Sequence, residues 1–407
     1  MADTQPTRQV DADVDVDGKL KSAAEENSEH AEKGRPRVSG LFIYPIKSCG
    51  GIAVDSAAVT ATGLQWDRQW MVVDASSRRF ITQRQCAAMA LIRTALPPEA
   101  LLPPHTWAHT LPADACLYIT APGHPPLHVP LSLSWYRGER LGRRAGTKGE
   151  GRGGEGGGEG EREERGSEGR WVTVTVWGWT GRALDAGDDA SEWFSRVMGR
   201  QVRLVRFDTA HVVRPTSPDF ADGFQTSFAD GYPMLLISQA SLSSLNARLP
   251  HPVPMNRFRP NIVVSGCEPF DEDTWRSFSV APYGHEASDK EARGRDHGSG
   301  SSDAAPVGVF RGVKPCSRCK ITTIDQLTAE SGKEPLQTFL KFRRGKDLGL
   351  QTSIQDVFFG MNVVFQPARS IDPTPALPAE QRSLALLSLG DEIDVLAADP
   401  RLATLYP

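Results

Sequence analysis

The sequence predicts a β-rich α+β fold in two domains, and three observations lead to this class. The chain has 407 residues, 39% of them hydrophobic, which is enough to bury the cores of two domains, or of one large domain with tails. Its apolar runs are mostly short and alternate with polar residues, as half-buried strands do. Helical spacing of apolar residues is limited to a few short stretches, so strands are expected to dominate both halves.

Composition excludes several classes of protein. The formal net charge is −4, and the first 36 residues, with nine acidic against five basic side chains, account for all of it. The remainder lacks the basic excess of a nucleic-acid binder, and no apolar run approaches the ~20 residues of a membrane span. Six irregularly spaced cysteines do not make a disulfide scaffold, which indicates a reducing compartment. With no secretory or transit segment evident, we expect a cytoplasmic location.

Composition also divides the chain. Residues 1–36 are polar and acidic, and are expected to form a disordered tail. The ordered part is predicted to comprise an N-terminal domain, 37–207, and a second domain, 208–400. Each contains a polar insertion that cannot form a core: 137–170, where thirteen of 34 residues are glycine, and 284–306. Both insertions are expected to be disordered surface loops.

The first domain is predicted to consist mainly of strands. The expected strands are 38–46, 52–59, 66–74, 80–84, 127–136, 171–177 and 201–207. A helix capped by Asp188 or Asp189 and ended by Gly199 precedes the last strand. After the first strand, a glycine-rich turn carries Lys47 and Ser48, which can direct an ammonium group, a hydroxyl and backbone N–H groups at an anion.

The second domain is also predicted to be largely β. The expected strands are 234–237, 262–266, 307–310, 321–325, 362–365 and 393–396. Ser238 caps a helix with leucines on one face, and another helix begins at Pro335. Arg257, Arg259 and Asn261 lead into the strand at 262, which places two cations and an amide at one point of the fold.

Cys316 and Cys319 form the best candidate site for a soft metal ligand or a redox thiol. They are three positions apart among Lys314, Arg318 and Lys320, and nearby positive charge favours the thiolate, the reactive and metal-binding form. Two idle cysteines in an exposed turn are the plain alternative. Structural zinc usually needs two close ligand pairs, and there is no second Cys-x2-Cys. A thioredoxin-like pair would open a helix, whereas a strand is expected here. The interpretation that remains is a single thiolate ligand beside a polyanion that Lys, Arg, Ser and Asn side chains hold.

Several motifs in a fixed order resemble the MOSC superfamily, and within it the amidoxime reducing component, called mitochondrial in animals. The motifs are Ile43-Tyr44-Pro45-Ile46-Lys47-Ser48-Cys49, Asp67-Arg68-Gln69-Trp70, Asn256 to Asn261, and Cys316-Ser317-Arg318-Cys319. The resemblance spans roughly 38–396 apart from the insertions. It implies an N-terminal, β-barrel-like MOSC domain packed on a MOSC β-barrel domain, with molybdenum cofactor (Mo-molybdopterin) between them.

The resemblance also implies roles for individual residues. Cys319 matches the cysteine that supplies the protein sulfur ligand to molybdenum, and Arg318 matches a position beside the metal. Positions that hold the cofactor in the family correspond to Lys47, Ser48, Arg68, Arg259 and Asn261. Their charges and donors suit a pterin that carries a phosphate. For Arg68, a simple ion pair with Asp67 is the plain alternative.

Asp230 falls where the family has an acid close to the metal, and is the candidate for positioning or proton transfer. Gly231 and Tyr232 differ from the Thr-Ser of animal members, so cofactor contacts there would come from the backbone. The glycine-rich insertions, and an N-terminus without the membrane anchor of animal members, are typical of a soluble algal or plant-type member.

The implied function is a molybdenum-dependent reductase of N-oxygenated compounds, such as amidoximes, N-hydroxylamines and N-hydroxylated bases. Electrons are expected from cytochrome b5 and its NADH-dependent reductase. No Gly-x-Gly-x-x-Gly fingerprint precedes a helix, which fits an external electron supply. Nothing in the residues selects nitrite as a substrate. The alternatives are a cofactor carrier or sulfur-transfer module without reductase activity, and a structural β-barrel with an unused site.

Overall fold

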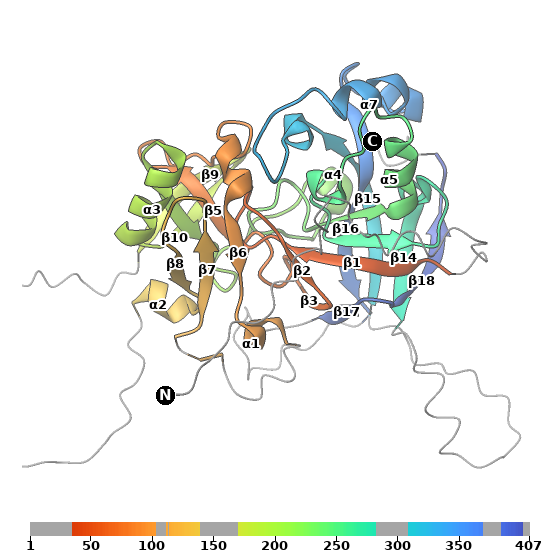
Figure 1. Ribbon diagram of the computed structural model, residues 1–407. Helices are drawn as coiled ribbons and strands as arrows, with labels where there is room; N and C mark the ends of the chain where they lie inside the picture. Colours follow the sequence, from red (N-terminus) through yellow and green to blue (C-terminus); the bar gives the residue numbers. More distant parts are fainter. Residues whose placement is uncertain are drawn as a thin grey trace, which may run out of the picture.

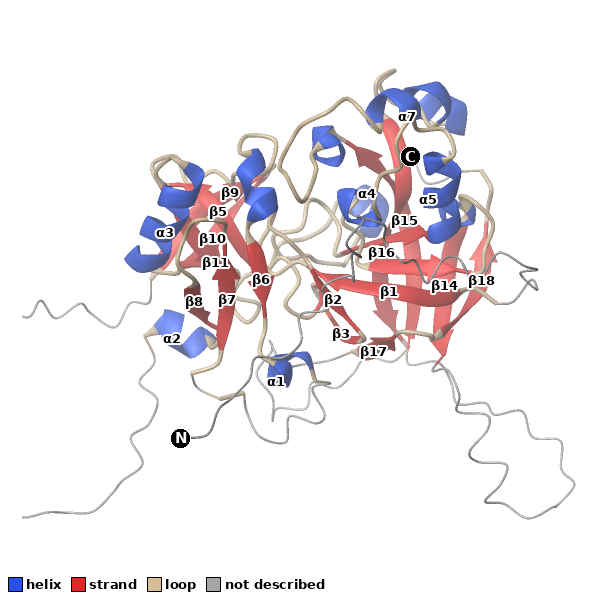
Figure 2. Cartoon of the chain, viewed as in Figure 1, coloured by secondary structure: helices blue, strands red, loops and turns tan. Residues whose placement is uncertain are grey.

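The computed structural model describes residues 35–102, 111–112, 114–138, 170–281, 308–368 and 384–401. The predicted acidic tail and the two predicted insertions lie almost entirely outside these ranges. Two β-rich lobes lie side by side (Figure 1). Short helices lie at the periphery of both (Figure 2), so the β-rich α+β class is confirmed.

The larger lobe is a closed barrel of seven strands. In order around the barrel they are β13 (Ile262–Ser265), β12 (Met234–Ser238), β16 (Val357–Pro367), β15 (Gly308–Arg318), β14 (Trp275–Ala281), β18 (Glu392–Ala398) and β1 (Arg37–Ile43). Pairing of β1 with β13 closes the ring. Only β12 and β13 run parallel to each other among these pairs. Closure leaves no unpaired edge between these seven strands.

The first strand of the chain therefore lies in the barrel formed mainly by the second half, where Leu41 pairs with Ile262. β2 (Ile52–Val54) extends β1 outside the ring. A small sheet of β17 (Ala385–Ser388), β3 (Ser56–Thr60) and β4 (Gly63–Leu64) also joins segments from both ends of the chain. Strands from both sides of residues 207 and 208 thus share sheets. The predicted domain boundary at this point stays a prediction.

The smaller lobe contains two sheets and helix α3 (Asp188–Met198). One sheet has the order β5 (Trp70–Asp74), β11 (Val202–Arg206), β10 (Trp179–Asp185) and β9 (Trp171–Val176); the other is β6 (Arg93–Ala95), β7 (Cys116–Thr120) and β8 (Leu127–Pro130). α3 buries Trp193, Phe194 and Met198. Two short helices, α1 (Pro98–Leu101) and α2 (Leu133–Arg137), and a 3-10 turn at Ala87–Leu91 complete this lobe.

Helices cover the outside of the barrel. They are α4 (Pro218–Ala221), α5 (Gln239–Asn246) and α7 (Leu336–Phe342), with 3-10 turns at Met255–Arg257, Asp271–Asp273, Lys320–Thr323 and Gly345–Leu348. Leu236 faces the main core, whereas its neighbour Ile237 packs with Leu245 of α5 and Phe339 of α7. This alternation is the period-2 pattern of a strand covered on both faces. Ser238 caps α5 as predicted, because its Oγ accepts the Ser241 N–H at 2.9 Å.

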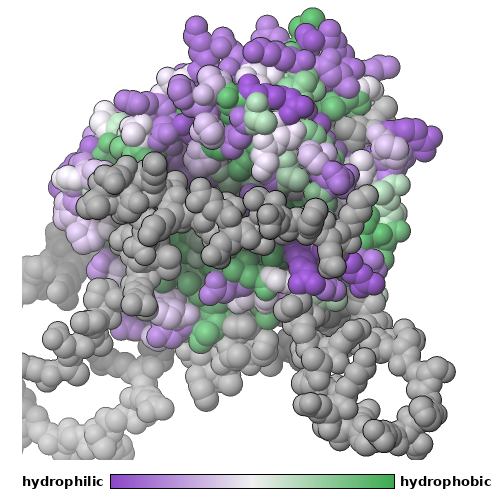
Figure 3. Space-filling view, turned by 45° about the vertical axis from the view of Figure 1, so that its right-hand side comes forward, coloured by the Kyte–Doolittle hydropathy of each residue, from purple (hydrophilic) through white to green (hydrophobic). Residues whose placement is uncertain are grey.

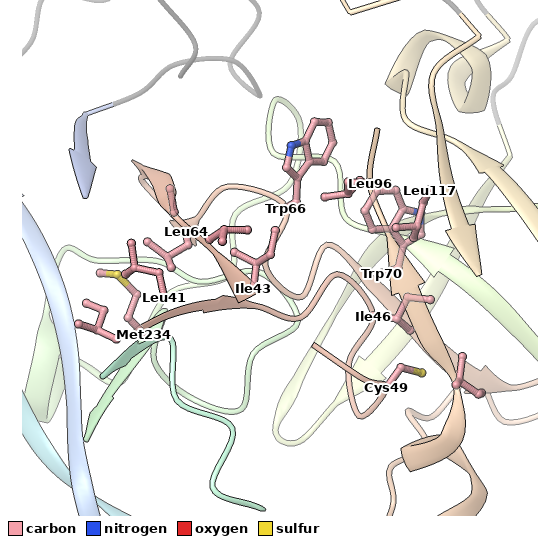
Figure 4. Packing of buried hydrophobic residues seen from close by; sticks show 14 of the residues in the cluster. Leu41, Ile43, Ile46, Cys49, Leu64, Trp66, Trp70, Leu96, Leu117 and Met234 are labelled. Carbon is pink, nitrogen blue, oxygen red and sulfur yellow. The ribbon is translucent and has the colours of Figure 1, made fainter. Parts of the chain in front are cut away.

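The largest buried apolar cluster of the described residues extends across both lobes. Figure 4 shows Leu41, Ile43, Leu64 and Met234 on one side of this core, continuing to Trp66, Trp70, Leu96 and Leu117 on the other. Because the cluster is continuous, the lobes form one packed body, and residues at their junction are held at fixed positions.

Several predicted elements are wrong in detail. The strand predicted at 66–74 starts only at Trp70, and the return strand at 80–84 is reduced to an isolated bridge between Val73 and Phe80. The strand predicted at 127–136 ends at Pro130, and α2 follows it.

The helix cap predicted at Asp188 or Asp189 is also wrong: the N-cap is Gly187, whose N–H donates to Asp185 at 2.8 Å, while Asp188 pairs with Arg203. Gly199 ends the helix in a left-handed conformation, as predicted.

The segment after the cysteine pair is not the predicted strand. Lys320–Thr323 form a 3-10 turn, and Cys319 is its N-cap residue. The hydroxyls of Thr322 and Thr323 donate to the carbonyls of Cys319 and Lys320, at 3.0 and 2.9 Å. Local side-chain bonds of this kind compete with strand formation and overcome the β propensity of the Ile-Thr-Thr-Ile run.

Polar residues prevail on the face shown in Figure 3, and apolar residues lie in smaller groups between them. In the part of the chain that the structure describes, we find no helix with the length and hydrophobicity that crossing a bilayer requires.

Candidate functional site

A cavity of about 140 Å³ lies where the lobes meet, and residues from both halves of the chain line it. The structure brings all of the predicted site residues to its wall: Lys47, Ser48, Arg68, Asp230, Gly231, Tyr232, Arg259, Asn261, Arg318 and Cys319. Positions as much as 272 residues apart in the sequence thus converge on one space. Their individual chemical roles stay predictions.

Lys47 reaches the cavity from the turn that follows β1. Its N–H donates to the Trp70 carbonyl at 2.8 Å, which ties the turn to β5. Its ammonium group, in a residue only 4% exposed, donates to the Phe228 carbonyl at 2.9 Å and forms an ion pair with Asp230. Burial lowers the pKa of Lys47 to about 8, although the Asp230 carboxylate opposes this. Burial thus makes the Lys47 ammonium group easier to deprotonate than that of an exposed lysine.

Asp230 sits on a loop that Arg214 holds in place. The Arg214 guanidinium donates to the carbonyls of Ser227, Ala229 and Asp230, at 2.7, 2.5 and 2.7 Å. The Asp230 side chain is 57% exposed. Partial burial raises its pKa, but the charge and hydrogen bond of Lys47, followed by Arg84, outweigh burial and keep the pKa well below its usual range. Asp230 is thus a carboxylate at neutral pH.

Arg68 has two functions in the structure. It pairs with both oxygens of buried Asp67 at 2.7 Å, which is the plain alternative considered from sequence. It also donates to the Asn261 side-chain oxygen at 3.0 Å and the Arg259 carbonyl at 3.2 Å, and it lines the cavity. Burial raises the pKa of Asp67, although Arg68 opposes this.

The Asn261 side chain is already engaged with the barrel. Its Nδ2 donates to the Phe42 carbonyl at 3.1 Å, and its Oδ1 accepts the Leu235 N–H at 3.2 Å. Asn261 therefore joins β1 to β12, so its structural role is stronger than the sequence pattern indicated.

Arg259 and Arg318 carry buried donors that lack acceptors within the described chain. Arg259 lies 4.3 Å from the Tyr44 ring centroid, and its Nη2 has no hydrogen-bond partner. Burial, with the nearby charge of Arg68, lowers the pKa of Arg259 to about 10. Arg318 donates to the Phe258 carbonyl at 2.6 Å, while its Nε is likewise unpaired. Unpaired buried guanidinium donors cost free energy, and an anion in the cavity would supply the missing acceptors.

Cys319 directly follows β15 at the cavity wall. Its sulfur accepts hydrogen bonds from Arg84 Nη2 at 2.9 Å and Nε at 3.3 Å. All six cysteines, Cys316 and Cys319 included, are free thiols. Among the described residues no group of three or more His, Cys, Asp or Glu could hold a metal ion.

Arg84 is the residue that the sequence analysis missed. Besides holding the Cys319 sulfur, it lies 4.0 Å from Asp230. Its segment is fixed by the neighbouring Gln83, which donates to the Ser48 carbonyl at 2.8 Å and to Gln326 at 2.9 Å. The sequence predicted a plain hairpin strand here. No local pattern marks Arg84, because its role depends on contact with Cys319, which is 235 positions away in the sequence.

Backbone strain also gathers at the cavity. Ser48, Arg68 and Arg259 have φ angles of 67°, 46° and 57°, in the left-handed region that favours glycine. Such conformations cost about 1–3 kcal/mol each and are concentrated at functional sites. Strain at three lining residues indicates that the shape of this cavity is maintained at the expense of stability.

Comparison with known proteins agrees with this fold and site. Residues 35–152 match the MOSC N-terminal beta barrel domain, and residues 224–373 match the MOSC domain. The chain is 30% identical to mitochondrial amidoxime reducing component 2 of Bos taurus over 315 residues, covering 75% of this chain and 72% of that protein. Identity to mitochondrial amidoxime-reducing component 1 of Mus musculus is 29%, with 75% and 71% covered.

Molybdenum cofactor sulfurase of Drosophila willistoni is 24% identical over 78% of this chain and 31% of its own length. The chain belongs to the MOSC-domain family, alongside the mitochondrial amidoxime reducing components. The predicted resemblance and its two-domain MOSC fold are thereby confirmed. Proteins of this family are generally associated with molybdenum cofactor.

Proposed function

We propose that this protein is a molybdenum-cofactor-dependent reductase of N-hydroxylated compounds, including amidoximes. The observation that carries the proposal is a free thiol, Cys319, held by Arg84 in a cavity whose buried guanidinium donors lack acceptors. Relatives at about 30% identity named as amidoxime reducing components support the reaction class.

The residues present fit the cofactor. Arg259 and Arg318 would hold the anionic part of the cofactor with their unpaired donors, and Lys47, Ser48 and Arg68 would add positive charge and a hydroxyl on the same wall. Cys319 would provide a soft thiolate ligand, which suits molybdenum. When bound, the cofactor would supply the electron-transferring metal centre that the side chains themselves lack.

The side chains around that centre would position the substrate and supply protons. Asp230 is ionised at neutral pH, so it would accept a hydrogen bond from the N–OH group and position it, rather than donate a proton. Lys47, with its pKa lowered to about 8, is the better proton donor, since its Nζ can release a proton near neutral pH. Because the two groups lie side by side, Lys47 would be close enough to supply a proton to the hydroxyl group that Asp230 positions and that leaves as water.

Electrons must come from outside the chain. We propose cytochrome b5 and its NADH-dependent reductase as donors, as the family resemblance implies, and a cytoplasmic location. Reconstitution with these two proteins tests the donors, and cell fractionation tests the location.

The decisive experiment measures metal and turnover together. Purified full-length protein should contain molybdenum rather than zinc by elemental analysis, and should reduce benzamidoxime with NADH, cytochrome b5 and its reductase. Cys319→Ala should lose both the molybdenum and the activity, whereas Cys267→Ala, which changes a half-buried cysteine away from the cavity lining, should retain both.

Full activity in Cys319→Ala would contradict the proposed ligand. Tight cofactor binding without any turnover would instead favour a cofactor carrier or sulfur-transfer module. The similarity to a molybdenum cofactor sulfurase supports this alternative.

A further inference from the structure

Trp177 is an aromatic side chain that does not itself line the cavity but contacts two residues that do, Arg84 and Asp230. It lies in the turn between β9 and β10, and its Nε1 donates to Asp230 Oδ1 at 3.1 Å. The Arg84 guanidinium lies 4.9 Å from its ring centroid, and the Phe80 ring lies 5.0 Å away, tilted by 55°. Because Arg84 and Asp230 both line the cavity, these contacts fix the indole directly beside it.

Core packing does not explain this position. Trp177 is 44% exposed, and it belongs to none of the buried apolar clusters of the described chain, whereas the neighbouring Trp179 packs against one. Its φ of 51° lies in the left-handed region, which is unfavourable for a bulky residue. A large aromatic surface is thus kept rigid, strained and accessible at the mouth of the site. Such surfaces are typical of ligand contacts.

We propose that Trp177 binds the planar, conjugated part of the substrate by stacking, and thereby makes the site selective for aromatic N-hydroxylated compounds. The inference rests on the proposed function. With the N–OH group near Asp230 and Cys319, a ring attached to the same carbon would reach the rim, where the accessible indole surface lies. The substrates favoured would be aryl amidoximes and N-hydroxylated heterocyclic bases, in preference to small aliphatic compounds.

The charges around the indole define the ligand further. Arg84 lies over the Trp177 ring, and Lys47 and Arg318 are also on the cavity wall. These cations repel a positively charged ring system, while Asp230, the carboxylate that accepts the Trp177 hydrogen bond, is already paired with Lys47. A neutral conjugated substrate therefore suits the rim better than a cationic one.

Steady-state kinetics with two matched substrates test the proposal. Benzamidoxime and acetamidoxime carry the same N–OH group, but only the first has a ring. In Trp177→Leu holoenzyme, KM for benzamidoxime should rise about tenfold, as expected for loss of one stacking contact, while kcat and the KM for acetamidoxime stay within twofold. Trp177→Phe retains a ring and should keep most of the affinity for benzamidoxime, although it loses the hydrogen bond to Asp230.

Trp135 provides the matched control. It is also an exposed tryptophan (41%) beside an arginine, with Arg170 at 4.6 Å, but it lies in α2, and its ring contacts, with Arg170 and Tyr136, are to residues that do not line the cavity. Trp135→Leu should leave both substrates unaffected. If Trp177→Leu behaves like this control, the proposal is overturned. An equal loss of kcat/KM for both substrates in Trp177→Leu and Trp177→Phe also overturns it, because that pattern identifies a residue that only positions Asp230.

A binding measurement separates this inference from the proposed reaction. Benzamidoxime should quench the tryptophan fluorescence of the wild-type protein, acetamidoxime should not, and the quenching should disappear in Trp177→Leu while persisting in Trp135→Leu. This result without any turnover would mean that the aromatic site exists and that the proposed reductase activity is wrong. Equal quenching in wild type and Trp177→Leu would overturn the aromatic site itself.

Discussion

Replacing Arg259 with methionine should make the cofactor-free protein more stable while weakening its hold on the cofactor. Methionine keeps the length and apolar character of the arginine stem but removes its charge and donors. In the cofactor-free protein the Arg259 guanidinium is buried, and its Nη2 lacks an acceptor. The substitution therefore removes an unfavourable group from one state and a cofactor contact from the other.

The expected magnitude follows from two opposing terms. Burial and the charge of Arg68 lower the pKa of Arg259 from 12.5 to about 10, which corresponds to about 3 kcal/mol against the charged form. Loss of the contact with the Tyr44 ring at 4.3 Å costs about 0.5–2 kcal/mol. The left-handed backbone of residue 259 is strained in either case. The net result should be a stabilisation of about 1–2 kcal/mol.

Urea unfolding of protein produced in cells that cannot make the cofactor measures the first effect. Molybdenum content of protein produced in cells that can make it measures the second, and should fall severalfold. Arg248→Met is the control, because Arg248 also lies over an aromatic ring, that of Phe342 at 4.7 Å, but on the surface. It should change stability by no more than about 0.5 kcal/mol. A destabilised Arg259→Met protein with normal molybdenum content would refute the reasoning.

Three further outcomes are expected. In a denaturation assay, Gly63→Ala should destabilise the protein by about 2 kcal/mol or more, because the φ of Gly63 is +113° and a Cβ there would lie 2.6 Å from the Pro233 carbonyl oxygen. Gly178→Ala is the control: a Cβ at that position meets no atom within 4 Å, so the substitution should be nearly neutral. Ser238→Ala should cost about 1 kcal/mol by removing the cap of α5, which thermal unfolding would register. Burial, with the charge of a neighbouring acid, raises the pKa of Glu272 from 4.5 to about 7. The stabilising contribution of Glu272 is therefore complete below pH 4.5 and is lost as pH rises through 7. Glu272→Gln should gain stability relative to wild type over that interval, and a constant difference in stability across these pH values would disprove the effect.

Local sequence determined the elements whose causes are local. Gly199 ends α3 because glycine adopts the left-handed conformation without a steric penalty, and Ser238 caps α5 through an atom three residues from its partner. The site residues could also be predicted, because resemblance to a family assigns roles to positions in this sequence. Spacing alone would not have shown that these positions come together in the fold. Lys47, Asp230 and Cys319 were named this way, and the structure places them on one cavity wall.

Only the tertiary structure decided the contacts between remote segments. β1 completes the barrel of the second half because Leu41 pairs with Ile262 across 221 residues, and neither strand carries a signal for its partner. The 3-10 turn after Cys319 arises where threonine hydroxyls bond locally and override β propensity. Arg84 and Trp177 come from a loop and a hairpin turn of the smaller lobe. Arg84 donates to Cys319 and Trp177 donates to Asp230, and these contacts define the role of each residue. Sequence patterns report local conformation and one-dimensional order, whereas hydrogen bonds and charges act through space, so these neighbours could be found only in the folded chain.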